Sequence, residues 1–376
     1  MGFPLTHNDK RPEGEVAMKR RNFLTATGAA AVAASTVYSP NVIASNRRFR
    51  LEMPTSWPAA LENLYGTAEY FARRINEMTD GDVEVRTYPG GDQIGPLEVY
   101  DAVSSGAFPC CHTAPYYYIG QSPAHGFYTA IPFGLTLDEQ NAWMYAGGGQ
   151  ELWDELNARD NMIAFPGGNT SAQTGGWFNK RIEGPDDLRG LRMRFPGHGG
   201  RVMAKAGVNI QQLPGGEVYT AMDRGALDAA EWVGPADDMT LAMHEVAQYY
   251  YMPSWAEPSA MLGFYFNLET WDEFPADIQA QIRACCAEAN SWMAAQYLKT
   301  NPQALATLQE EHGIEVLDFP ESVIDAFWEG AREVHEEDME DETYARIYEE
   351  WDAFRRQIRG WNERTTFQYQ QYIFNR

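Results

Sequence analysis

Residues 213–235 have the sequence LPGGEVYTAMDRGALDAAEWVGP, which combines a helix, a stop and a strand within a short length. We predict a helix from Gly216 to Arg224, ended by Gly225, and a buried strand over the apolar run Ala229 to Val233. This order is typical of an α/β fold, in which ligands bind beyond the carboxyl ends of the strands. Glu231 is therefore placed where a ligand crevice is expected, although an exposed strand end would look the same.

A second polar segment lies in a predicted strand upstream. The strand from Leu191 to Phe195 alternates so that Arg192 and Arg194 share one face. An arginine at a strand end can point into a cleft, where its planar guanidinium matches a carboxylate with two hydrogen bonds. A salt bridge on a solvated edge is the alternative interpretation of Arg194.

Apolar and amphipathic runs alternate on both sides of these segments. From Phe49 to Thr113 they predict a strand, a helix opened by Pro58, a strand, a helix opened by Pro96, and a strand. A second half of this kind begins near Gly168, and Met261 to Asn267 is a strand that can cross back to the first half. The remainder is predicted to be mostly helical, with helices at 278–299, 304–311, 324–337 and 344–361, an interruption at Pro302 and a strand at 314–317.

The N-terminal region has the features of an export signal. The run Lys19-Arg20-Arg21-Asn22-Phe23-Leu24 precedes an apolar stretch from Thr25 to Val37, which is typical of a twin-arginine signal. The stretch is too short to span a hydrocarbon layer of ~30 Å, and small residues near Ala44 suit a signal peptidase. We expect removal of residues 1–44 and a periplasmic protein, with a retained amphipathic anchor as the alternative.

The composition excludes several classes of protein. A net charge of -24 repels nucleic acid and anionic lipid, so neither is an expected partner. The G-x-S-x-G, H-E-x-x-H and P-loop motifs do not occur, so signatures of an enzyme are missing. The four cysteines form the adjacent pairs Cys110-Cys111 and Cys285-Cys286, and both buried free thiols and a disulfide between the pairs remain open.

At the two polar segments the chain resembles a known family, the extracytoplasmic solute-binding receptors of TRAP transporters, particularly the branch that binds 2-oxo acids and lactate. The resemblance extends from about Arg48 to the C-terminus. It implies an α/β, two-lobed binding protein, not an enzyme, that closes on a small carboxylate and delivers it to a membrane permease. The motifs that carry it occur in one order: Thr55-Ser56-Trp57-Pro58, His112-Thr113-Ala114, Gly175-Gly176-Trp177-Phe178, Met193-Arg194-Phe195-Pro196-Gly197, Leu213-Pro214-Gly215-Gly216-Glu217, Glu231-Trp232-Val233-Gly234-Pro235 and Asp237-Asp238.

The resemblance also implies a division of the chain into two lobes joined by hinge strands and a long helix. Lobe I is expected at 45–168, completed by about 261–300. Lobe II is expected at 169–260, completed by about 301–340. A helical extension follows at 341–376.

Single residues acquire roles from the same resemblance. Arg194 matches the arginine that clamps the ligand carboxylate, and Gln173 matches an amide beside it. Trp57 and Tyr117 match aromatic walls of the cleft. We therefore expect these four side chains to contact a small monocarboxylate, either a 2-oxo acid such as pyruvate or a 2-hydroxy acid such as lactate.

The resemblance further implies a metal ion that bridges protein and ligand, held by Glu231, the backbone carbonyl of Trp232, and Glu257. Two glutamates and a ligand carboxylate bring three negative charges against the one positive charge of Arg194, which is costly in a closed cleft. A hard cation offsets this repulsion, and oxygen ligands select sodium or calcium over zinc or copper. The residues do not choose between sodium and calcium.

Two other functions are compatible with the same residues. An exported sensor module would bind the same ligand and pass the signal to another protein. A metal-assisted hydrolase would use Glu231 as a base, but no nucleophile or orienting partner accompanies it.

The C-terminal stretch carries more aromatic side chains than a terminal helix usually leaves in water. It packs either along its own lobes or against a second copy, as in dimeric members of the branch that the chain resembles. We predict a homodimer. The aromatic side chains concerned are Tyr344, Tyr348, Trp351, Phe354, Trp361, Phe367, Tyr369, Tyr372 and Phe374.

Overall fold

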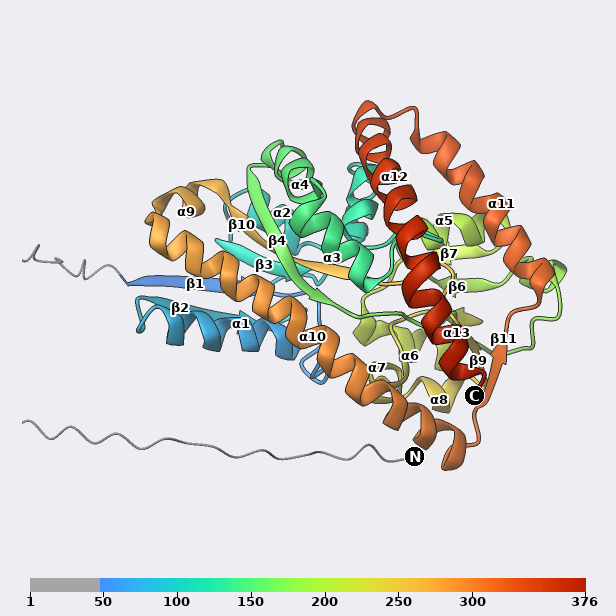
Figure 1. Cartoon of the computed structure of the whole chain (residues 1–376). Coiled ribbons are helices and arrows are strands. Elements are labelled where there is room, and N and C mark those ends of the chain that lie inside the picture. Colours follow the sequence, from blue (N-terminus) through green and yellow to red (C-terminus); the bar gives the residue numbers. More distant parts are fainter. Residues whose placement is uncertain (1–47) are drawn as a thin grey trace, which may run out of the picture. The chain divides into compact units, whose positions relative to one another are not determined.

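Three sheets organise residues 48–376, the part of the chain that the computed structural model describes (Figure 1). The predicted twin-arginine signal lies outside these residues, and its prediction stays open. None of the helices within 48–376 combines the length and the apolar character of a membrane span. We call the part built on the two smaller sheets lobe I and the part built on the six-stranded sheet lobe II.

Lobe I begins with the predicted β-α-β-α-β order. Strands β1 (Phe49–Pro54) and β2 (Val83–Tyr88) pair in parallel, and β3 (Cys110–Thr113) joins them through a parallel bridge between Thr55 and His112. Helices α1 (Tyr65–Met78) and α2 (Val99–Ser104) connect the three strands. The helix that was expected to begin at Pro58 begins at Tyr65 instead. Leu61 and Leu64 precede it and lie in an apolar cluster with Trp57.

Strand β10 (Met261–Asn267) crosses back into lobe I, as predicted, and pairs antiparallel with β3 and with β4 (Met162–Asn169). Strand β4 was not predicted from the sequence. All eight residues of β4 are buried, so β4 has none of the alternation by which a half-buried strand is recognised. Helices α3 (Leu137–Ala146), α4 (Gly149–Ala158) and α9 (Leu268–Glu273) flank these strands.

The sheet of lobe II has the order β11-β9-β5-β8-β6-β7. The strands are β5 (Gly176–Phe178), β6 (Arg192–Arg194), β7 (Asn209–Gln211), β8 (Ala229–Ala230), β9 (Tyr249–Met252) and β11 (Glu315–Asp318); the helices beside them are α5 (Gly197–Lys205), α6 (Gly215–Asp223), α7 (Pro235–Thr240) and α8 (Met243–Val246).

Helix α10 (Ala276–Glu310) contacts α1 and β4 in lobe I and α7 in lobe II, and Figure 1 shows it in orange. The predicted interruption at Pro302 is wrong, because the helix continues through this residue. A proline inside a helix costs about 3 kcal/mol. Contacts on both sides offset this cost: Tyr297 donates to the Asp237 carboxylate at 2.6 Å, and the Asn301 amide oxygen accepts from the Ala236 backbone at 3.1 Å.

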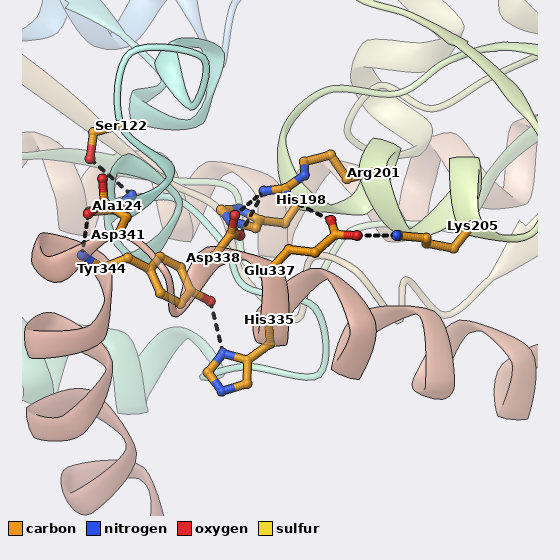
Figure 2. Close-up of polar contacts among 10 residues, drawn as sticks. All are labelled: Ser122, Ala124, His198, Arg201, Lys205, His335, Glu337, Asp338, Asp341 and Tyr344. Atoms are coloured by element: carbon orange, nitrogen blue, oxygen red, sulfur yellow. Dashed lines mark hydrogen bonds and ion pairs between the residues drawn. The ribbon is translucent and has the colours of Figure 1, made fainter.

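The C-terminal helices form a second connection between the lobes. Helix α11 (Glu321–Asp338) packs on α5 of lobe II, whereas α12 (Glu342–Asn362) packs on lobe I through Tyr344 and Trp351. At the corner between them, Asp338 accepts from Arg201 and His198 of α5 (Figure 2). The spacing of Tyr348, Trp351, Phe354 and Ile358 predicts one apolar face on this helix, and all four pack against lobe I, which confirms that face. The chain ends in a π-helical turn (Glu363–Phe367) and α13 (Gln368–Phe374), whose large apolar side chains are exposed.

All four cysteines are buried free thiols. This outcome confirms the first of the two interpretations of the adjacent pairs. Burial raises the pKa of Cys110 and Cys285 above the ordinary thiol value, so these thiols stay protonated and unreactive at neutral pH.

Candidate binding site

Two parallel strands of lobe II bring Arg194 and Glu231 to one edge of the sheet. Arg194 is the last residue of β6 and Glu231 follows β8, and the two strands pair with Arg194 opposite Ala230. The Glu231 backbone N–H donates to the Arg194 carbonyl at 3.0 Å, which continues the ladder by one residue. Carboxyl ends of parallel strands meet at the same edge, so the local sequence places both charged groups at the expected crevice.

The Arg194 side chain is completely buried and surrounded by oxygen atoms. Its Nη1 donates to the Glu231 carboxylate at 3.1 Å and also to the Glu231 carbonyl, and its Nε donates to the Leu213 carbonyl at 3.3 Å. The guanidinium carbon lies 4.7 Å from the centroid of the Trp232 ring. Arg194 is thus no exposed salt bridge, and the alternative drawn from the strand pattern is wrong.

Gln173 and Glu257 approach from two loops that are joined to each other. The Gln173 backbone N–H donates to the Glu257 carbonyl at 3.2 Å, and the Ser254 N–H donates to the Gln173 carbonyl at 3.1 Å. The hydroxyl of Ser254 accepts from the Glu257 N–H at 3.0 Å. These bonds hold the β4–β5 loop against the β9–β10 loop, so residues 84 positions apart reach the same place.

Several oxygen atoms at this place have no partner. Oε1 of Glu231, both carboxylate oxygens of Glu257 and the side-chain oxygen of Gln173 are buried without a hydrogen bond from any described residue. Burial raises the pKa of both glutamates, their mutual repulsion adds to this for Glu231, and Arg194 opposes it. A buried carboxylate without partners costs several kcal/mol. The arrangement fits a cation, which would supply the missing positive charge.

The atoms available to bind a cation are few, and all of them are oxygens, which are hard ligands. Among residues 48–376 there is no group of three or more His, Cys, Asp and Glu side chains placed to hold a metal. A cation here would use the two glutamates and the Trp232 carbonyl, and oxygens of the ligand would complete its coordination. This donor set suits sodium or calcium, which take oxygen ligands, rather than zinc.

The expected aromatic walls come from lobe I. Trp57 follows β1 and Tyr117 lies in the 3-10 turn after β3 (Pro115–Tyr118), with their ring centroids 6.2 Å apart. Both line a small cavity of about 10 Å³, which is room for one water molecule. Gln173 and Trp232 also line this cavity. Arg194 lies over the Trp232 ring and bonds Glu231, and the Glu257 carbonyl bonds the Gln173 backbone, so these three residues adjoin the cavity. All seven predicted residues therefore gather here, although their roles stay predictions.

Two residues of the site were not predicted from the sequence. Tyr116 is buried, and burial followed by the charge of Glu257 raises its pKa. His112 accepts from Trp57 Nε1 at 2.9 Å while its own Nε2 bonds the Gly167 carbonyl at 3.0 Å. Burial lowers the pKa of His112 to about 3, so the ring is neutral and Nε2 carries the proton. His112 stood inside a quoted motif, but no local pattern separates Tyr116 from Tyr117.

Two glycines permit the close packing of this site. A Cβ at Gly215 would lie 2.4 Å from the Trp232 ring, so any other residue there would displace this ring. A Cβ at Gly197 would lie 2.6 Å from the Tyr116 ring, and Gly197 also has a positive φ of 64°. Only glycine meets both demands at Gly197.

The comparisons with known proteins agree with this geometry. Residues 55–342 match the model of the family described as DctP, bacterial extracellular solute-binding protein, family 7, and the chain belongs to this family. Its members are solute-binding proteins, not enzymes. A curated relative from Nostoc sp., described as a monocarboxylate 2-oxoacid-binding periplasmic protein, is 42% identical, and the match covers 94% of this chain and 99% of the relative.

Solved structures of similar proteins contain ligands and cations. A TRAP transporter solute-binding protein from Bordetella bronchiseptica is 38% identical with a TM-score of 0.86, and the match covers 87% of this chain and 98% of that one. It is described as a dimer with calcium and picolinate in one site. The corresponding protein from Pseudoalteromonas atlantica holds sodium and pyruvate, with 34% identity, a TM-score of 0.83 and coverage of 86% and 99%.

Proposed function

We propose that this protein captures a small 2-oxo or 2-hydroxy monocarboxylate, such as pyruvate or lactate, together with a sodium or calcium ion. The observation that carries the proposal is the set of buried glutamate oxygens without partners beside a buried arginine. A finished structural core satisfies such groups, whereas a receptor leaves them for its ligand. The similar proteins with pyruvate or picolinate and a cation support the same ligand class.

Each residue of the site has its own role in binding. Arg194 donates to the ligand carboxylate, which takes over from the Glu231 carboxylate as the acceptor of Nη1. Glu231, released from this pair, would hold the cation together with Glu257 and the Trp232 carbonyl. A cation held there would supply the positive charge that offsets the carboxylates of protein and ligand. Trp57, Tyr116 and Tyr117 close the apolar side from lobe I and exclude water, while the amide of Gln173 orients the ligand.

Native mass spectrometry of the mature protein purified without refolding tests this proposal, because it reports ligand and cation together. Calorimetric titration with pyruvate should then show binding in sodium or calcium buffer. It should show at least tenfold weaker binding after chelation and transfer to a choline buffer of equal ionic strength. A pyruvate affinity that does not depend on the cation would refute the metal site. Continuous heat release, as from conversion of pyruvate to a product, would show an enzyme and refute the receptor function.

Delivery requires export and a partner in the membrane. We propose that residues 1–44 direct export by the twin-arginine route and that the loaded receptor docks on a TRAP permease. We also retain the proposed division into lobe I at 45–168 and lobe II at 169–260, completed by 261–300 and 301–340, with an extension at 341–376. Replacement of Arg20 and Arg21 by lysine should abolish export, as fractionation of cells would show.

We further propose a homodimer formed through the last helix. The exposed side chains after α12 include Phe367 at 58% and Phe374 at 83% exposure, and the similar protein from B. bronchiseptica is described as a dimer. Truncation after Asn362 should yield a monomer that still binds ligand. Truncation after Asp341 should yield insoluble protein, because it removes Tyr344 and Trp351 from the core of lobe I. A light-scattering mass of one subunit for the intact mature chain would refute the dimer.

A further inference from the structure

Asp238 is a completely buried carboxylate directly behind the segment that carries Glu231 and Trp232. Its Oδ1 accepts from the backbone N–H of Val233 at 3.2 Å and of Gly234 at 3.1 Å. Its Oδ2 accepts from Trp177 Nε1 at 2.9 Å and from the Tyr250 hydroxyl at 2.6 Å. Both oxygens are therefore satisfied, in contrast to those of Glu231 and Glu257.

Every one of these four donors is neutral. Within residues 48–376 Asp238 forms no ion pair with a lysine, arginine or histidine. Burial raises the pKa of Asp238 to about 6, and the four hydrogen bonds oppose this rise, so the carboxylate is ionised at pH 7 and above without a cation to cancel its charge. The charge lies close to the site, because the Val233 N–H that Asp238 binds belongs to the same peptide group as the Trp232 carbonyl, and the Asp238 charge is one of the smaller causes that raise the pKa of Glu231. Two of its bonds end on Val233 and Gly234, immediately after the Trp232 carbonyl.

We infer that Asp238 makes the cation site selective for a divalent ion, calcium, over sodium, by adding a buried negative charge that touches neither cation nor ligand. This inference rests on the proposed function. Asp238 is thus a residue that determines specificity through charge, and it also positions the Trp232 carbonyl through its bonds to the next two residues.

A count of charges shows why the fourth carboxylate matters. Glu231, Glu257 and the ligand oppose Arg194 alone, and calcium would bring this inner set to neutrality. With Asp238 included, calcium leaves one net negative charge in a buried site and sodium leaves two. Sodium and calcium have nearly equal ionic radii, so charge is the main property by which this site can separate them.

The test removes the charge and keeps the shape. An Asp238→Asn amide can still accept from Val233 and Gly234, but its NH₂ group would face the indole N–H of Trp177. The double variant Asp238→Asn, Trp177→Phe removes this clash of donors, and the Tyr250 hydroxyl can turn to accept. Calcium alone and sodium alone are titrated into ligand-free protein, with tryptophan fluorescence as the readout, and pyruvate is then titrated by calorimetry at saturating levels of each ion.

An effect of the Asp238 charge and an effect of loop structure predict different ratios between the losses of calcium and sodium affinity. A lost Coulomb interaction is twice as large for a divalent as for a monovalent ion, so the logarithm of the affinity loss doubles. We expect calcium to bind about tenfold more weakly and sodium about threefold more weakly than to Trp177→Phe alone. Equal losses for the two ions would mean that Asp238 only shapes the loop, and no loss for either would mean that its charge is screened. Both results overturn the inference.

Asp237→Asn is the matched control. Asp237 is the neighbouring buried carboxylate, but it bonds the Tyr297 hydroxyl of α10 at 2.6 Å and not the Glu231–Gly234 segment. Its replacement should change the calcium-to-sodium ratio by less than about twofold. A ratio that falls as much as in the Asp238 variant would show that any buried charge nearby has the same effect, which would also overturn the inference.

A measurement on the wild-type protein covers the case in which the variants do not fold. Lanthanum(III), an oxygen-seeking ion similar in size to calcium with one more charge, should bind more tightly than calcium, and calcium more tightly than sodium. The reverse order would overturn the inference. Failure of the proposed function looks different, because wild-type protein would then bind pyruvate equally well with calcium, sodium or choline.

Discussion

Two clusters in lobe II pair an arginine with buried acidic side chains, and they differ in how many of the carboxylate oxygens accept hydrogen bonds. At the α11–α12 corner, Oδ1 of Asp338 accepts from Arg201 at 2.5 Å, and Oδ2 accepts from Arg201 at 2.7 Å and from His198 at 2.9 Å (Figure 2). At the sheet edge, Arg194 reaches only one carboxylate oxygen of Glu231. The other oxygen of Glu231 and both of Glu257 have no partner.

This difference separates a contact that stabilises the fold from one that prepares for a ligand. A complete cluster stabilises the chain, because each desolvated oxygen is compensated. An incomplete cluster destabilises the empty protein, and the missing interactions are formed only when cation and carboxylate enter. Complete clusters should therefore respond to mutation in stability, and incomplete ones in affinity.

The largest expected effect is on the incomplete cluster. Arg194→Lys should weaken pyruvate binding by about 2–4 kcal/mol, or some 30- to 1,000-fold, because a point ammonium cannot reproduce the bidentate fork. Calorimetric titration measures it. Arg192→Lys is the control, since this exposed neighbour pairs with Asp228 and should stay within twofold of wild type. An affinity of Arg194→Lys within threefold of wild type would remove this residue from the pocket.

Glu257→Gln should have opposite effects on affinity and stability. We expect pyruvate affinity to fall about tenfold to a hundredfold, because the cation loses a charged ligand. The ligand-free protein should melt no lower than wild type, and up to a few degrees higher, because the replaced carboxyl is buried without partners and burial, opposed by Arg194, raises its pKa to about 8. Glu231→Gln should lower affinity in the same way. Calorimetry and thermal denaturation check both, and a clear loss of stability in Glu257→Gln with unchanged affinity would reverse the assignment of this cluster.

Asp338→Asn should show the reverse pattern. We expect a loss of about 1–2 kcal/mol in unfolding free energy, because the amide cannot accept from both Arg201 and His198, while pyruvate affinity stays within threefold. Urea denaturation measures the first quantity. Glu337→Gln on the exposed side of α11 is the control and should cost less than about 0.5 kcal/mol. A large change of affinity in Asp338→Asn would mean that the α11–α12 corner is coupled to ligand binding.

The smallest expected effect is the pH dependence of the difference in stability between wild type and Asp338→Asn. Burial alone would raise the pKa of Asp338, but hydrogen bonds from His198 and Arg201 outweigh burial and lower it. A carboxylate with a lowered folded-state pKa adds stability above the ordinary value of about 4, and this stability is lost as pH falls through the lowered value. The gap between wild type and Asp338→Asn should therefore narrow below about pH 4. Urea midpoints from pH 7 to 3 check this, and a constant gap would contradict it.

Periodicity within the chain was enough for much of the fold. The strand Met261–Asn267 appears with the predicted bounds, and the apolar face of α12 is where the spacing of Tyr348 and Trp351 placed it. Strand β4 and the continuous α10 could not be predicted in this way. A strand buried on both faces has no alternation, and the cost of Pro302 is offset by residues far from it in sequence.

The sequence by itself determined the charges and the chemistry available at the site. It placed Arg194 and Glu231 at strand ends in an acidic chain without enzyme motifs, and the resemblance of its motifs added Gln173 and Glu257. Tertiary structure alone decided which of these groups would be satisfied. Asp238 gained four donors and Glu257 none, although both are buried acids in one lobe. The physical reason is that a hydrogen bond depends on distances of about 3 Å between residues remote in sequence, which local patterns do not contain.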